Sequence, residues 1–391
     1  MDAAKVYEQA WRLSGSKDQK SGFRAVRLFG EMGAGGAKDC GRLALEMLGK
    51  LKGRQALELG NYSFERCSHG NWNRKGCIAL GEKIIAMNLV RDAGRKAEIH
   101  YVVAGHLWGT GQRVNALTHY RKAWDLQKDD EGYLYQLIAV TYDGSGKAAQ
   151  LKPLVDEYGR RHPSNQEIFG RALSNLAHAH AREKQLPQAV AVAARALSHN
   201  PGYRDLAIYY VRWINEVDPN RLGEAEQALR GALSKAPAQA RHFIRLALAL
   251  DLYRDRRKDL NRARGEVRQL IREEPVNDGR IASALSWYLT SSPDEGTFRR
   301  EAQELLKYAQ ANGHLSHLRS WFQDWVKGKG GEDLEKGNRN WFRPEVKKLN
   351  DHPEIKEWVA FDKAIGSNKP SAFISLSKKL NTERKFKRFH Y

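Results

Sequence analysis

The sequence predicts an all-α protein in which pairs of amphipathic helices repeat along the chain as an α-solenoid. Two observations carry this prediction. Prolines recur at regular intervals, at Pro163, Pro201, Pro237 and Pro275, which lie 38, 36 and 38 residues apart. Small apolar residues recur at similar distances before each proline, such as Ala189, Ala193 and Ala196 before Pro201. Small residues at fixed points let two helices cross closely, and a proline marks where each pair ends.

The N-terminal region, residues 1–97, has helical spacing of its apolar residues but no clear period. We expect helices over Ala3–Leu13, Phe23–Met32, Cys40–Leu51, Gln55–Phe64 and Ile78–Val90. Two interpretations of this region stay open, divergent helix pairs that continue the solenoid or a small separate helical domain.

The clearest repeat unit is Glu167–Pro201, which reads as two short amphipathic helices separated by a polar break. Counting outward from it gives about six units over residues 98–312. A unit of this size cannot bury its apolar faces alone, so at least three units must stack. In this register His180 takes a packing position between helices, whereas His178 faces the groove between the stacked units.

Small and aromatic residues in these units resemble the tetratricopeptide repeat pattern. The matching residues are Ala116, Tyr120, Ala123, Ala139, Tyr142, Ala189, Ala196 and Pro201. The tryptophan that the family carries in its first helix is absent, and the units are longer than the 34 residues that are usual. The resemblance implies a right-handed solenoid of helix-turn-helix repeats. It also implies a non-catalytic scaffold or adaptor for protein–protein interaction, whose first helices line a concave groove.

Positions that line the groove in that family map onto aromatic and basic residues here. The resemblance assigns the groove to Tyr101, Trp108, Tyr133, Gln136, Arg171, Ser174, His178, Arg182, Arg245 and Arg256. Arginine forks and aromatic rings are common anchors of binding energy. We therefore expect a protein or peptide partner, and an acidic segment would suit this lining.

Residues 313–391 change character, because tryptophans and phenylalanines crowd between Trp321 and Phe361. We expect a helical subdomain that caps the open end of the solenoid, followed by a basic tail. The tail carries Lys378, Lys379, Arg384, Lys385, Lys387 and Arg388 against a single carboxylate, Glu383. It could be merely solvated, or it could bind a polyanion by charge and stacking.

Net charge gives a second hypothesis, in which the protein binds RNA or DNA. The chain of 391 residues carries +20, with +8 on residues 1–97, +7 on residues 313–391 and only +5 between them. Basic flanks attract nucleic acid through counterion release. The N-terminus does not look like a signal peptide, no apolar run is long enough to span a membrane, and three cysteines form no disulfide framework. These features predict a cytoplasmic protein with no membrane partner.

Chemical motifs are sparse, so we expect no enzyme activity, no catalytic residues, no cofactor and no metal. Cys40, Cys67, His69 and Cys77 lack the paired spacing of a zinc site. A helical nuclease is the third hypothesis, because one ribonuclease superfamily uses an Arg and a His with four to six residues between them. Four such pairs occur, Arg95/His100, Arg113/His119, Arg171/His178 and Arg384/His390, about as many as the frequency of arginine predicts by chance.

Overall fold

The computed structural model describes residues 2–68, 73–203 and 205–272, together with isolated positions between 281 and 304. All regular structure in this part of the chain is helical, as predicted, and no strand occurs in it. The chain divides into two compact units, residues 1–192 and 193–391. The predicted cap, residues 313–391, and its basic tail lie outside the described residues, as does Pro275.

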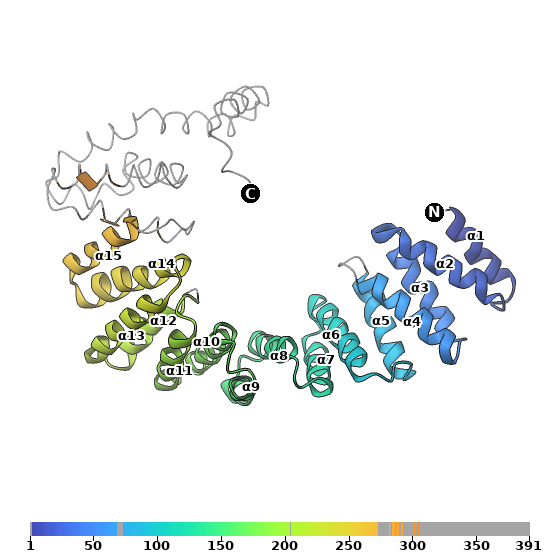
Figure 1. Ribbon diagram of the computed structural model, residues 1–391, viewed down its shortest axis with the longest axis horizontal. Helices are drawn as coiled ribbons and strands as arrows, with labels where there is room; N and C mark the ends of the chain where they lie inside the picture. Colours follow the sequence, from blue (N-terminus) through green and yellow to red (C-terminus); the bar gives the residue numbers. More distant parts are fainter. Residues whose placement is uncertain are drawn as a thin grey trace, which may run out of the picture. The chain divides into compact units, whose positions relative to one another are not determined.

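Unit 1 is a succession of helices in which each packs against the next in the sequence (Figure 1). Next-but-one neighbours also touch, namely α2 with α4, α3 with α5 and α8 with α10. This near-neighbour packing is the arrangement expected of an α-solenoid. The elements are α1 (Asp2–Leu13), α2 (Gln19–Glu31), η1 (Gly33–Gly35), α3 (Ala37–Leu48), α4 (Gly53–Ser68), α5 (Arg74–Ala86), α6 (Ala93–Gly109), α7 (Arg113–Leu126), α8 (Glu131–Gly144), α9 (Ala148–Arg161) and α10 (Gln166–Arg182), with α11 (Leu186–His199) crossing the boundary between the units.

The helices α6, α8 and α10, each the first of its pair, begin in the same way, with a short polar side chain that caps the helix. The side chain of Asp92 accepts a hydrogen bond from the backbone N–H of Arg95 at 2.7 Å. Asp130 and Asn165 do the same for α8 and α10, at 2.9 and 3.2 Å. Each cap satisfies an amide that the helix leaves without a partner. These capping residues therefore determine where α6, α8 and α10 begin.

The turns inside three of the helix pairs also share one conformation. Gly111, Gly146 and Lys184 each lie between the two helices of a pair and have φ of 82°, 61° and 60°. A left-handed residue lets the chain reverse within a short turn, and glycine adopts it without steric cost. Second helices end where the prolines predicted, because α9 ends at Arg161 and α11 at His199, two residues before Pro163 and Pro201.

Small residues set how closely the helices of unit 1 approach. Ala116, Ala123 and Ala189 are fully buried, as the repeat pattern predicted. A Cβ added at Gly81 would lie 2.3 Å from Val103 and 2.8 Å from Phe64. Such contacts leave no room for a larger side chain, so the spacing of α4, α5 and α6 depends on Gly81.

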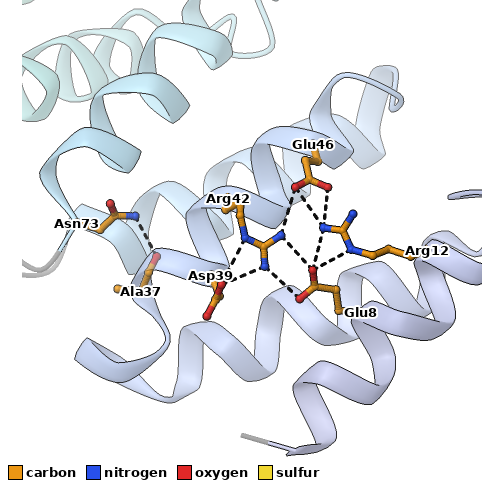
Figure 2. Close-up of polar contacts among 7 residues, drawn as sticks. All are labelled: Glu8, Arg12, Ala37, Asp39, Arg42, Glu46 and Asn73. Atoms are coloured by element: carbon orange, nitrogen blue, oxygen red, sulfur yellow. Dashed lines mark hydrogen bonds and ion pairs between the residues drawn. The ribbon is translucent and has the colours of Figure 1, made fainter.

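An ion-pair network joins α1 to α3 (Figure 2). Glu8 lies between Arg12 and Arg42, at 2.9 and 3.0 Å, and Arg42 also contacts Asp39 and Glu46. Burial acts to raise the pKa of Glu8, but hydrogen bonds from the two guanidinium groups outweigh it and the pKa is lowered. The network fixes the first helix to its next-but-one neighbour.

Unit 2 contains α12 (Leu206–Val217), η2 (Pro219–Arg221), α13 (Leu222–Lys235), α14 (Ala238–Leu246), η3 (Ala247–Arg257) and α15 (Leu260–Arg272). α13 ends two residues before Pro237, again as predicted. η3 is a π-helix, which the sequence pattern did not predict. Buried carboxylates organise this unit: Glu266 binds Arg230 and Arg245, and Glu301 binds Arg264. In the described residues no helix is both long and apolar enough to span a bilayer.

The left-handed turns give a stability prediction. Gly111→Ala should lower the free energy of unfolding by about 1–2 kcal/mol, because a Cβ is disfavoured at that φ although it would meet no atom within 4 Å. Lys184→Gly should raise it by up to about 1 kcal/mol, because it relieves the same strain. Urea denaturation followed by far-UV circular dichroism measures both.

Gly35→Ala is the matched control, since an added Cβ there also meets nothing and the backbone is not left-handed. Equal effects of the two Gly→Ala changes would contradict the account of the turns.

Candidate interaction surfaces

Aromatic side chains from three successive helices meet in unit 1. The ring of Tyr101 on α6 lies 5.0 Å from that of Tyr133 on α8 and 5.5 Å from that of Tyr120 on α7, measured between centroids. Gln136 hydrogen-bonds to Tyr120, and burial raises the pKa of Tyr120 to about 12. Tyr101, Tyr133 and Gln136 are partly exposed. Three of the residues that the sequence placed in a groove therefore lie together and remain accessible.

A second group of contacts continues from α6 through α8 to α10. The Arg182 guanidinium lies over the Tyr142 ring, 4.3 Å from its centroid, and Arg113 lies over Trp108 at 5.3 Å. A Cβ at Gly144 would come within 3.7 Å of Trp108, so the ends of α6 and α8 are adjacent. We refer to Tyr101, Trp108, Tyr133, Tyr142 and Arg182 together as the aromatic face.

The other groove residues predicted on α10 differ in their exposure and in their contacts. Ser174 is fully buried, so its prediction as a groove residue is wrong: it lies on the packed side of the helix. His178 is partly exposed, and burial together with Arg182 lowers its pKa. Arg171 pairs with Glu167 on its own helix at 2.5 Å. His180 was predicted to pack between helices, but its Nδ1 hydrogen-bonds to the Gln185 side chain in the following turn, at 2.6 Å.

In unit 2 the two predicted groove residues, Arg245 and Arg256, differ in how exposed they are. Arg245 donates to Glu266 at 2.9 Å, and its side chain is only 14% exposed. It compensates a buried carboxylate and does not line an open surface, so the prediction is wrong for Arg245. Arg256 is exposed at the end of η3.

Two histidines that belong to different Arg/His pairs of the sequence analysis contact each other. His100 on α6 and His119 on α7 approach with their Nδ1 atoms 3.1 Å apart. Burial lowers the pKa of His100 to about 4, with help from His119, Lys122 and Lys96, and burial also lowers the pKa of His119. At neutral pH both rings are uncharged, so one Nδ1–H donates to the lone pair of the other. His100 borders a mostly apolar pocket of about 420 Å³.

The contacts of the nearby arginines bear on the nuclease hypothesis. Arg95 is held by Glu65 and Glu98, at 2.9 and 2.6 Å, and Arg113 lies over Trp108. The hydrogen bonds described for these two arginines do not reach either histidine. Arg384 and His390 lie outside the described residues. The described contacts of Arg95 and Arg113 therefore do not join either arginine to a histidine.

Of the residues weighed for a zinc site, the structure describes the side chains of Cys40 and Cys77. Cys77 is disulfide-bonded, a bond that the sequence pattern did not predict, and its sulfur is not free to bind metal. Cys40 is buried, and burial raises the pKa of its thiol to about 11. Within the described residues, no group of three His, Cys, Asp or Glu side chains could hold a metal ion.

The histidine pair predicts sensitivity to acid. Because the folded-state pKa of each ring lies below the ordinary 6.5, the unfolded chain binds more protons as the pH falls below that value. The contribution of the pair to the free energy of unfolding should be fully present above about pH 6.5 and should decline toward pH 4. His100 alone should contribute about 1 kcal/mol of this decline between about pH 6.5 and 5.5.

Denaturant titrations at several pH values test this on the wild type and on the double variant His100→Gln/His119→Gln. The variant should lose less stability than the wild type on acidification, and parallel pH profiles would contradict the prediction.

The sequence matches no protein-family model, and no curated protein matches it at a significant level.

Proposed function

We propose that the chain is a non-catalytic interaction scaffold with tetratricopeptide-like geometry that binds an extended segment of a partner protein along the aromatic face. The observation that supports this most is the run of side-chain contacts from α6 to α10. Tyr101 meets Tyr133, and Arg182 stacks on Tyr142. First helices of successive pairs are thus joined by side-chain contacts, which a groove for an extended chain would use.

The side chains of this face suit an acidic segment. Tyrosine offers a large apolar area with one hydrogen-bonding group, and few of its rotamers are lost on binding. Arg182 is exposed and forms no ion pair within the described part of the chain, so its guanidinium can bind a carboxylate while it stacks on Tyr142. The repeated caps at Asp92, Asp130 and Asn165 support the repeat geometry on which the groove depends.

Affinity capture tests the proposal with two substitutions in the aromatic face and a charge-matched control outside it. Arg182→Glu and Tyr133→Ala should each weaken capture of the partner by about tenfold, because both remove an anchor of the aromatic face. Arg121→Glu changes the charge equally at an exposed position of α7, the second helix of its pair, and should leave capture unchanged.

Capture should also survive nuclease treatment. A partner lost on nuclease treatment, or lost equally in the Arg182 and Arg121 variants, would contradict binding of a protein segment at the aromatic face.

A further inference from the structure

A second surface of unit 1, on α2 and α4, carries cations over aromatic rings. Lys20, Arg24 and Arg27 lie four and three residues apart on α2, so they share one face over about 10 Å of the helix. The Arg24 guanidinium lies over Tyr7 of α1, 5.3 Å from the ring centroid. Arg27 and Arg66 both lie over Tyr62 of α4, at 5.9 and 5.5 Å. We call Lys20, Arg24, Arg27 and Arg66 the α2–α4 basic patch.

The basic patch borders a pocket of about 580 Å³. Its lining includes the first three of these cations, the partly exposed ring of Phe23 and the polar side chains of Gln19 and Gln55. Two carboxylates also line it, Glu31 and Glu58, and Glu58 is paired with Arg54 at 2.7 Å. The pocket therefore combines a row of cations with an aromatic ring and hydrogen-bonding groups.

These cations are not held in ion pairs by the carboxylates of the described residues, although Asp18 feels the charge of nearby Lys20. Within the described part of the chain, none of Lys20, Arg24, Arg27 and Arg66 forms an ion pair. The arginines of α1 and α3 differ, because Arg12 and Arg42 form ion pairs with three carboxylates (Figure 2). Cations that are stacked on rings and lack carboxylates are placed to bind an external anion.

The stacked platform is also held in place. The Tyr62 hydroxyl donates to the backbone carbonyl of Arg27 at 3.0 Å. A Cβ added at Gly30 would lie 2.9 Å from the Tyr62 oxygen and 3.2 Å from the side chain of Arg66. The glycine thus lets α2 and α4 bring both guanidinium groups to one ring, which lowers the conformational cost of binding.

We propose that the α2–α4 basic patch binds the phosphodiester backbone of a single-stranded nucleic acid. A row of cations along a helix matches a polymer with a charge on every unit better than it matches scattered carboxylates of a peptide. Phe23 and the flanking amides provide stacking and hydrogen bonds of the kind used in single-strand binding. The net charge of +20 adds a long-range attraction for a polyanion. This site is separate from the aromatic face, and neither proposal depends on the other.

Fluorescence anisotropy with the full chain and a labelled oligouridylate tests the proposal over a range of salt concentrations. The triple variant Lys20→Ala/Arg24→Ala/Arg27→Ala should bind at least about tenfold more weakly in low salt. For this variant, the slope of the logarithm of the binding constant against the logarithm of the salt concentration should also be less steep by about 2, because three phosphate contacts are lost. The control Lys75→Ala/Arg91→Ala/Arg121→Ala removes the same charge from exposed positions elsewhere in unit 1 and should keep the wild-type slope.

Two further measurements keep the result decisive. Arg24→Lys/Arg27→Lys preserves the charge and should preserve the salt slope, because the slope reports how many cations contact phosphate. A labelled oligoglutamate of equal length can bind at the aromatic face, so its affinity should not change when the patch residues are substituted. Equal slopes for the two triple variants, or tight oligoglutamate binding that the patch substitutions abolish, would overturn the proposal.

Discussion

Close helix packing through small residues is the constraint on which the rest of unit 1 depends. Fully buried alanines such as Ala104 and Ala116 let neighbouring helices approach, and Gly81 leaves no room for even a methyl group against Val103. Because the helices are this close, side chains on successive first helices come within contact distance of each other. The meeting of Tyr101 with Tyr133 is a consequence of that spacing. The aromatic face is thus produced by the packing beneath it.

Electrostatics distinguishes structural arginines from those available for binding. Arg42 and Arg245 are bound by carboxylates and hold helices together. Arg24, Arg27 and Arg182 stack on tyrosine rings and form no ion pair within the described part of the chain. Stacking orients a guanidinium while leaving its N–H groups free to donate, which suits recognition of carboxylate or phosphate. A strongly basic composition therefore contains two populations of arginine with different uses.

The sequence predicted the helices well because periodicity, prolines and small residues act locally. The family resemblance assigned Tyr101, Tyr133 and Gln136 to a groove, and in the structure the ring of Tyr101 lies against that of Tyr133. It misplaced Ser174 and Arg245, because whether a polar residue points into the packing depends on the exact rotation of its helix. The His100–His119 pair joins different helices, and no local spacing reveals such a contact. The caps at Asp92, Asp130 and Asn165 were readable and would have fixed the starts of the first helices.

Site-specific photo-crosslinking tests the central claim, that the aromatic face is the surface that meets a partner. A benzophenone amino acid placed at position 133, on α8, should give a protein adduct that survives nuclease treatment. The same group at position 121, exposed on α7, should give none. Adducts of equal yield from both positions, or adducts from position 121 alone, would contradict the account.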